Sequence, residues 1–413
     1  MSTPAAPSLS GRRFQAPLDR RLLPRPLPAH LASAALLWAS SRAGLASLSA
    51  GSPPSNGPKL GVLAAQIAQA GSDRVAAALD RELKRRAELF LAGLEAYRRH
   101  GHSRGPEERQ VAWRNGSTRL LDYGGPGRPV LVVPSLINRY YIVDLLPERS
   151  FARFLRAAGL RPLVVDWGEP GDAEQGFGLD DYIAGRLDAA ASAALDLAGA
   201  PLAIAGYCMG GLLALALAQR RIGQIAGLAL LATPWDFHAE RPEQARVLGT
   251  LVETAASGDT LPLWIIQSLF LSLDPFLAEG KFIRFAGLDP ESEAARDFVA
   301  LEDWLNDGVP LAAGVARQCA LAWYRDNQPG RGAWQVAGET IAPRRLDRPA
   351  LVVVPRRDRI VPPRSAEALG AVLPRATTLR PPLGHIGMMA SAAAPELIWA
   401  PIAEWLHASF AAA

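Results

Sequence analysis

One stretch constrains the fold of this chain more than any other: residues 202–217, which read LAIAGYCMGGLLALAL. A short apolar run leads into a glycine-rich turn around Cys208, and an Ala/Leu-rich run follows it. This is the strand–turn–helix pattern of a nucleophile elbow, G-x-S-x-G, with cysteine in place of serine. The sharp turn brings backbone segments close together, so Gly206 and Gly210 stand where only a hydrogen side chain fits. Gly211 would let the following helix pack closely against the sheet.

The helix expected after Cys208 would direct its free N–H groups and its positive dipole end at the sulfur, an arrangement that favours thiolate. We therefore predict that Cys208 is a nucleophile. The alternative interpretation is a buried structural cysteine in a glycine-containing turn. The rest of the chain must supply a base and a carboxylate for the first interpretation to hold.

Apolar runs alternate with helical patterns on both sides of this elbow. Unbroken apolar runs are typical of strands that are buried on both faces, and parallel strands need helical crossovers. The pattern predicts an α/β-hydrolase-type fold with a doubly wound, mostly parallel sheet. Besides the strand before Cys208, the expected strands are 119–123, 129–134, 162–167, 225–233, 349–355 and 376–379, and the expected helices include 150–158, 178–198 and 394–410.

The chain is expected to divide at about residue 105. Residues 1–105 would form an N-terminal arm and a helical segment, in which 51–58 (GSPPSNGP) is a linker. Residues 106–413 would form the catalytic domain. Within it, 235–312 interrupts the strand–helix alternation with aromatic residues at helical spacing, which indicates a helical lid over the active site or the core of a small helical subdomain.

The base and the carboxylate are expected downstream, because elbow enzymes of this fold follow the chain order nucleophile, acid, histidine. His385 lies in the glycine-flanked loop LGHIG after the last expected strand, where the base belongs. Asp358 follows the preceding expected strand and would hold the imidazole tautomer. Of the other downstream histidines, His238 precedes the expected acid and His407 lies on the terminal helix. Cys208, His385 and Asp358 are therefore the predicted catalytic triad.

An acyl-transfer site also needs backbone donors for the developing oxyanion. One is the N–H of Met209, directly after the nucleophile. The other should come from the loop after the strand 129–134, where Leu136, Ile137 and Asn138 are the candidates.

Composition narrows the function classes. The net charge is +4, but 41 of the 44 basic residues are arginines spread along the chain, which disfavours nucleic-acid binding. The two cysteines, Cys208 and Cys319, form no metal-ligand pattern and imply no disulfide framework. No secretory signal is evident, and the apolar stretch 31–50 is broken by polar residues and falls short of a membrane span. A cytoplasmic protein without a metal ion or resident cofactor is expected.

At this point the chain resembles the polyhydroxyalkanoate synthases, which belong to the α/β-hydrolase superfamily. The resemblance runs from about Pro129 to the C-terminus. It rests on INRYYIVDL at 137–145, GYCMGG at 206–211, DRIVP at 358–362 and GHIG at 384–387. VDWG at 165–168 and EDWLND at 302–307 support it, while Arg359 stands where the family often has histidine.

The resemblance implies polymerisation of 3-hydroxyacyl units from coenzyme A thioesters. Cys208 would carry the acyl chain as a thioester, His385 would be the base, and Asp358 would orient His385 or activate the incoming hydroxyl. Ile137 is the second oxyanion donor that the resemblance favours. It also implies a place at the surface of polyester granules, and leaves open a homodimer or a partner subunit.

Two other functions remain open on the sequence alone. The same triad would serve an intracellular polyester depolymerase, esterase or thioesterase, in which water is the acceptor. A non-catalytic granule-associated protein would keep the fold and leave Cys208 unreactive.

Overall fold

The computed structural model describes residues 21, 23–49, 58–105 and 109–411. Its centre is an eight-stranded sheet, in the order β1-β2-β4-β3-β5-β6-β11-β12. Six neighbouring strands of this sheet are parallel: β4, β3, β5, β6, β11 and β12. β1 and β2 add an antiparallel edge beside β4. The bounds are β1 (Gln110–Asn115), β2 (Thr118–Asp122), β3 (Pro129–Val133), β4 (Arg161–Asp166), β5 (Leu202–Tyr207), β6 (Ile225–Leu231), β11 (Ala350–Val353) and β12 (Ala376–Leu379).

The central strands are buried on both faces because helices cover each side of the sheet. The apolar cores on the two faces are separate, one against α5, α6 and α12 and the other against α4, α13 and α14. The predicted doubly wound, mostly parallel sheet is therefore confirmed. The bounds are α4 (Phe151–Ala157), α5 (Asp188–Ala198), α6 (Met209–Arg220), α12 (Pro363–Val372), α13 (Gly387–Ala390) and α14 (Ala400–Ala411).

Short helical segments of other pitch flank these elements. Three are 3₁₀ turns: η1 (Tyr140–Asp144), η3 (Ile222–Gln224) and η5 (Pro343–Arg345). Three are π-helical: η2 (Asp181–Leu187), η4 (Cys319–Arg325) and η6 (Pro395–Trp399).

A helical insertion separates β6 from β11, as expected for residues 235–312, but it continues to residue 349. Two short strands, β7 (Thr260–Leu261) and β8 (Leu311–Ala312), pair antiparallel and bring together the two ends of the segment that contains α8, α9 and α10. A small hairpin joins β9 (Gln335–Val336) to β10 (Glu339–Thr340). Neither of these strand pairs was predicted, because two-residue strands leave no periodicity in the sequence. The insertion helices are α7 (Pro242–Ala255), α8 (Leu263–Leu273), α9 (Leu277–Ala286), α10 (Glu293–Asn306) and α11 (Ala313–Gln318).

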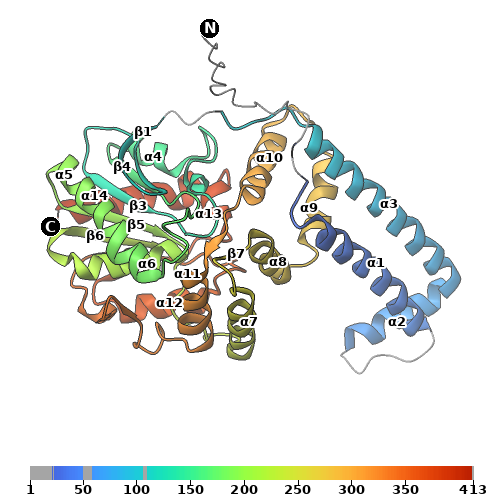
Figure 1. Cartoon of the computed structure of the whole chain (residues 1–413). Helices are drawn as coiled ribbons and strands as arrows, with labels where there is room; N and C mark the ends of the chain where they lie inside the picture. Colours follow the sequence, from blue (N-terminus) through green and yellow to red (C-terminus); the bar gives the residue numbers. More distant parts are fainter. Residues whose placement is uncertain (1–20, 22, 50–57, 106–108, 412–413) are drawn as a thin grey trace, which may run out of the picture.

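The N-terminal helices pack on this insertion rather than on the sheet (Figure 1). They are α1 (Leu27–Ser49), α2 (Pro58–Ala70) and α3 (Ser72–Arg99). Phe90, Leu94 and Tyr97 of α3 form an apolar core with Phe282 of α9 and Val299 of α10. The expected linker at 51–58 lies almost wholly outside the described residues, and α2 already begins at its last position. Among the helices that the structure describes, none is long and apolar enough to cross a membrane.

Candidate active site

Cys208 stands at the bend between β5 and α6. Its backbone has φ 56° and ψ −127°, a conformation that non-glycine residues rarely adopt and that tends to mark functional sites. Its N–H donates to the carbonyl of Leu231 at the end of β6, at 2.8 Å, which fixes the bend to the neighbouring strand. The residue is half-buried rather than sealed in the core.

The three glycines around Cys208 have no room for a side chain. A Cβ at Gly210 would lie 2.1 Å from the Val133 carbonyl oxygen of β3, and one at Gly211 would lie 1.8 Å from Thr233 Oγ1. A Cβ at Gly206 would meet the Cα of Gly211 at 2.5 Å. These contacts explain why the sequence places glycine at all three positions.

The loops after β11 and β12 bring His385 and Asp358 together. The Nδ1 atom of His385 lies 2.7 Å from Oδ2 of Asp358, and both side chains are buried. Asp358 is held in turn through its other oxygen, Oδ1, which accepts from the backbone N–H groups of Ile360 at 2.8 Å and Val361 at 2.9 Å. These two bonds fix the orientation of the carboxylate, so that Oδ2 is directed at the imidazole.

Cys208 contacts the other side of the same imidazole. The Cys208 side chain is among the groups that raise the pKa of His385, and since Nδ1 is engaged by Asp358, Nε2 is the ring nitrogen left to face the sulfur. Burial by itself lowers the pKa of His385, but the charge of Cys208 and the hydrogen bonds to Asp358 and Cys208 outweigh it and raise that pKa to about 10. The surroundings of His385 therefore favour its protonated, imidazolium form.

The two backbone groups predicted as oxyanion donors differ in their surroundings. Met209 begins α6, and within the ranges the structure describes its N–H has no hydrogen-bond partner. The Ile137 N–H already donates to Ser135 Oγ at 3.0 Å. The Met209 N–H is thus free to donate to an oxyanion. The Ile137 N–H would have to donate to both Ser135 Oγ and the oxyanion, or give up its bond to Ser135.

The other two histidines downstream of Cys208 and the second cysteine lie outside this cluster. His238 is bonded through its ring to the carbonyl of Tyr324 at 2.9 Å, and His407 is bonded to the carbonyl of Ala158 at 2.9 Å. Cys319 is buried, and burial raises its pKa far above the ordinary value. Its thiol is therefore held in the unreactive neutral form.

The last turn of α10 packs on the loop that carries Ile137, a contact that joins two motifs about 160 residues apart in the sequence. The indole N–H of Trp304 donates to the carbonyl of Arg139 at 2.8 Å. The hydroxyl of Tyr141 donates to Asp307 at 2.9 Å, and Asp307 also pairs with Arg139 at 3.3 Å. This insertion helix therefore supports the candidate oxyanion loop directly.

Helix α10 also links this loop to the N-terminal helices. One residue before Trp304, Asp303 accepts from the hydroxyl of Tyr97 in α3 at 2.8 Å and from Arg21 at 2.7 Å. The sequence motifs alone gave no sign of either contact.

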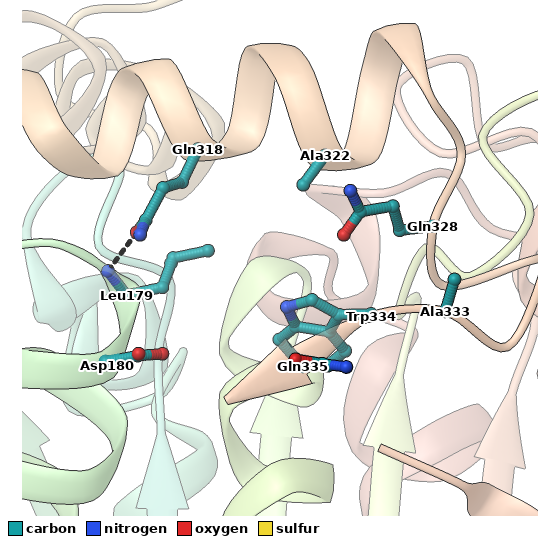
Figure 2. Close-up of a pocket in the computed structure, with 8 residues that line it drawn as sticks. All are labelled: Leu179, Asp180, Gln318, Ala322, Gln328, Ala333, Trp334 and Gln335. Atoms are coloured by element: carbon teal, nitrogen blue, oxygen red, sulfur yellow. Dashed lines mark hydrogen bonds between the residues drawn. The ribbon is translucent and has the colours of Figure 1, made fainter. Parts of the chain in front are cut away.

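A separate crevice of about 370 Å³ lies beside α11 and η4 (Figure 2). Its lining includes three glutamines, the indole of Trp334 and the carboxylate of Asp180, but none of the predicted triad. Gln318 spans one side and accepts from the backbone N–H of Leu179 at 2.5 Å. With no nucleophile or imidazole in its lining, this crevice is not the reaction site.

Among the described residues, no group of three or more His, Cys, Asp or Glu side chains could hold a metal ion.

The fold and the cysteine elbow define the class of protein: the chain has an α/β-hydrolase fold. A solved structure of a candidate non-heme bromoperoxidase, BpoC, from Mycobacterium tuberculosis superimposes with a TM-score of 0.50 at 19% identity, covering 74% of this chain and 99% of that one. At such low identity the likeness speaks for the fold alone.

Sequence comparison finds relatives among the polyhydroxyalkanoate polymerases. Residues 105–155 match the model of the poly-beta-hydroxybutyrate polymerase (PhaC) N-terminus. A poly(3-hydroxyalkanoate) polymerase subunit PhaC of Haloferax mediterranei is 28% identical over 318 residues, covering 73% of this chain and 64% of that protein. The subunit of the same name from Thiocystis violacea is 29% identical, covering 68% and 80%.

The chain is therefore similar in sequence to the polyhydroxyalkanoate synthases over about two thirds of its length or more. The resemblance named from residues 137–145 and 206–211 is confirmed. The family match begins at residue 105, earlier than the Pro129 from which the resemblance was traced.

Proposed function

We propose that this protein is an acyltransferase that polymerises 3-hydroxyacyl groups from coenzyme A thioesters into polyhydroxyalkanoate. The observation that carries the proposal is the hydrogen bond between His385 and Asp358 beside Cys208, which stands at the bend between β5 and α6, in a chain whose relatives are named as poly(3-hydroxyalkanoate) polymerases. Coenzyme A enters as part of the substrate, so no resident cofactor is needed.

In the first step, the sulfur of Cys208 attacks the thioester carbonyl and coenzyme A leaves as a thiolate, which takes the proton held on His385. One thioester replaces another, so this step is close to balanced in free energy. In the second step, His385 accepts the proton of an incoming hydroxyl, whose oxygen attacks the acyl–Cys208 thioester. An oxygen ester forms, the Cys208 thiolate is released, and His385 is again protonated.

The raised pKa of His385 suits this cycle. A group with a pKa of about 10 is protonated at neutral pH and can supply the proton that the leaving coenzyme A takes. Asp358, locked by Ile360 and Val361, fixes Nδ1 as the protonated nitrogen and leaves Nε2 to exchange its proton with the reactants. Met209 N–H is the proposed donor to the oxyanion, with Ile137 as the second.

Water must be kept from the acyl–cysteine for polymer to form. We propose that the insertion between β6 and β11 serves as the lid that excludes it. Arg359 supports this role, because it directly follows Asp358 and pairs with Asp274 at the C-terminal end of α8, at 2.5 Å. The protein would act at the surface of a polyester granule in the cytoplasm, as a homodimer or with a partner subunit.

The test is incubation of the purified protein with 3-hydroxybutyryl-coenzyme A. Insoluble polyester, together with a mass-spectrometric thioester adduct on the peptide that carries Cys208, is the expected result. Free hydroxy acid with no polymer would replace the synthase by a hydrolase that uses the same residues. Failure of Cys208 to form an adduct or to react with a thiol reagent at neutral pH would leave a non-catalytic protein of this fold. Cys319 provides the internal control for the reagent, because it is buried.

A further inference from the structure

The residue before the nucleophile, Tyr207, has no part in the steps above, yet it contacts the imidazole. Its phenol ring lies against His385 with ring centroids 5.2 Å apart and an angle of 34° between the planes. Its hydroxyl donates to the backbone carbonyl of His385 at 3.2 Å. Tyr207 is 4% exposed and His385 is 7% exposed, so water does not compete for either contact.

We propose that Tyr207 is a positioning residue that holds His385 at two points, the backbone carbonyl through its hydroxyl and the imidazole through its ring. This inference rests on the proposed role of His385 as the catalytic base. It assigns a function to the variable position before the cysteine in G-x-C-x-G, which the elbow geometry leaves unspecified.

The two contacts act in different ways. The hydroxyl anchors the loop that carries His385 to β5, the strand that carries the nucleophile, so both reacting groups are fixed to one strand. Burial, with the nearby charges of Cys208 and Asp358, raises the pKa of Tyr207 well above its ordinary value, which keeps the hydroxyl protonated and able to donate. The ring lies within the distance at which a cation–π interaction would stabilise the imidazolium.

The charged groups that face His385 are Cys208 from the elbow and Asp358 from the loop after β11. Both favour the imidazolium, so the phenol ring adds a third stabilising contact from the β5 side. Removing the ring should therefore lower the pKa of His385 even though both anions remain.

The experiment uses the full-length protein without substrate. The six histidines are labelled with ¹³C and titrated by NMR, and the His385→Gln variant identifies the His385 signal. In Tyr207→Leu, the loss of the buried cation–π contact should lower the pKa of His385 by about one unit. In Tyr207→Phe, the ring stays and the pKa should stay with it, but amide exchange in residues 384–388 should rise about fivefold because the carbonyl anchor is lost.

Tyr182→Phe is the matched control. Tyr182 is equally buried and packs edge-on against Trp167 at 5.8 Å, and its hydroxyl has no hydrogen-bond partner in the described part of the chain. Its variant should change neither measurement. The proposal is overturned if His385 titrates alike in Tyr207→Leu and Tyr182→Phe, or if Tyr207→Phe exchanges no faster than the control.

If Tyr207→Leu does not fold, the exchange measurement on Tyr207→Phe decides alone. Both readouts are made without turnover, so an inactive wild-type protein would refute the proposed function and leave this inference standing.

Discussion

Asp358→Asn would test the proposed catalytic line without disturbing its surroundings. The two backbone N–H groups that hold Asp358 both donate to Oδ1, while Oδ2 alone faces His385. An asparagine can keep both backbone bonds through its single carbonyl oxygen. Its NH₂ group must then occupy the place of Oδ2 and point at Nδ1 of His385.

That orientation imposes the other tautomer on the imidazole of His385. Facing a donor, Nδ1 of His385 must be an acceptor, so the proton moves to Nε2, the nitrogen that faces Cys208, and the ring can no longer take a proton there. A wrong tautomer in a nucleophile–histidine–aspartate site costs about 10³- to 10⁴-fold in turnover, or about 4 to 5.5 kcal/mol. The loss of stability should be smaller than in Asp358→Ala, since the two backbone bonds survive and only the charge-assisted bond to His385 is lost.

The assay follows coenzyme A released from 3-hydroxybutyryl-coenzyme A by chromatography, beside urea unfolding of the same samples. Asp358→Ala is the control for the backbone contacts, because it leaves two donors unpaired and should lose about 1–3 kcal/mol of stability as well. An Asp358→Asn variant that turns over within tenfold of the wild type would refute the reasoning.

The same variant separates the two roles that Asp358 could have. If Asp358 orients His385, the first acylation of Cys208 and the later elongation both slow. If Asp358 instead activates the incoming hydroxyl, the first thioester adduct forms at the wild-type rate and only elongation slows. Mass spectrometry of the adduct at short times distinguishes these outcomes.

Three further predictions follow from the site. Because the pKa of His385 is raised from about 6.5 to about 10, its contribution to stability is complete below pH 6.5 and is lost as the pH rises through 10. The free energy of unfolding in urea should fall by at most about 4 kcal/mol between pH 7 and 10, and the His385→Gln variant should lack this decline. Cys208→Ala should abolish turnover and Cys208→Ser should leave a small residue of it, whereas Cys319→Ser should be nearly silent; a comparable loss in the Cys319 variant would contradict the assignment. Trp304→Phe should remove the bond to the Arg139 carbonyl and lower kcat about tenfold with little change in KM, because it loosens the oxyanion loop while leaving apolar packing in place. An unchanged kcat would show that α10 does not support the oxyanion loop during turnover.

Most of the sheet could be predicted because local signals and tertiary burial agree. The apolar runs at 129–134 and 225–233 became β3 and β6 almost unchanged. Each is buried on both faces, so every residue must be apolar and the pattern is unambiguous. The edge strand β1 and the two short antiparallel strand pairs were not predicted, because exposed or two-residue strands carry no such requirement.

The sequence by itself determined the elbow, since only glycine fits beside Val133 and Thr233, and it determined the chain order of Cys208, Asp358 and His385. Tertiary structure alone decided what those residues meet. The bond from Tyr207 to His385 and the bond from Trp304 to Arg139 join segments more than 160 residues apart, and no local propensity encodes a contact of that range. Spacing places a side chain on an element, but its partner depends on how the elements pack.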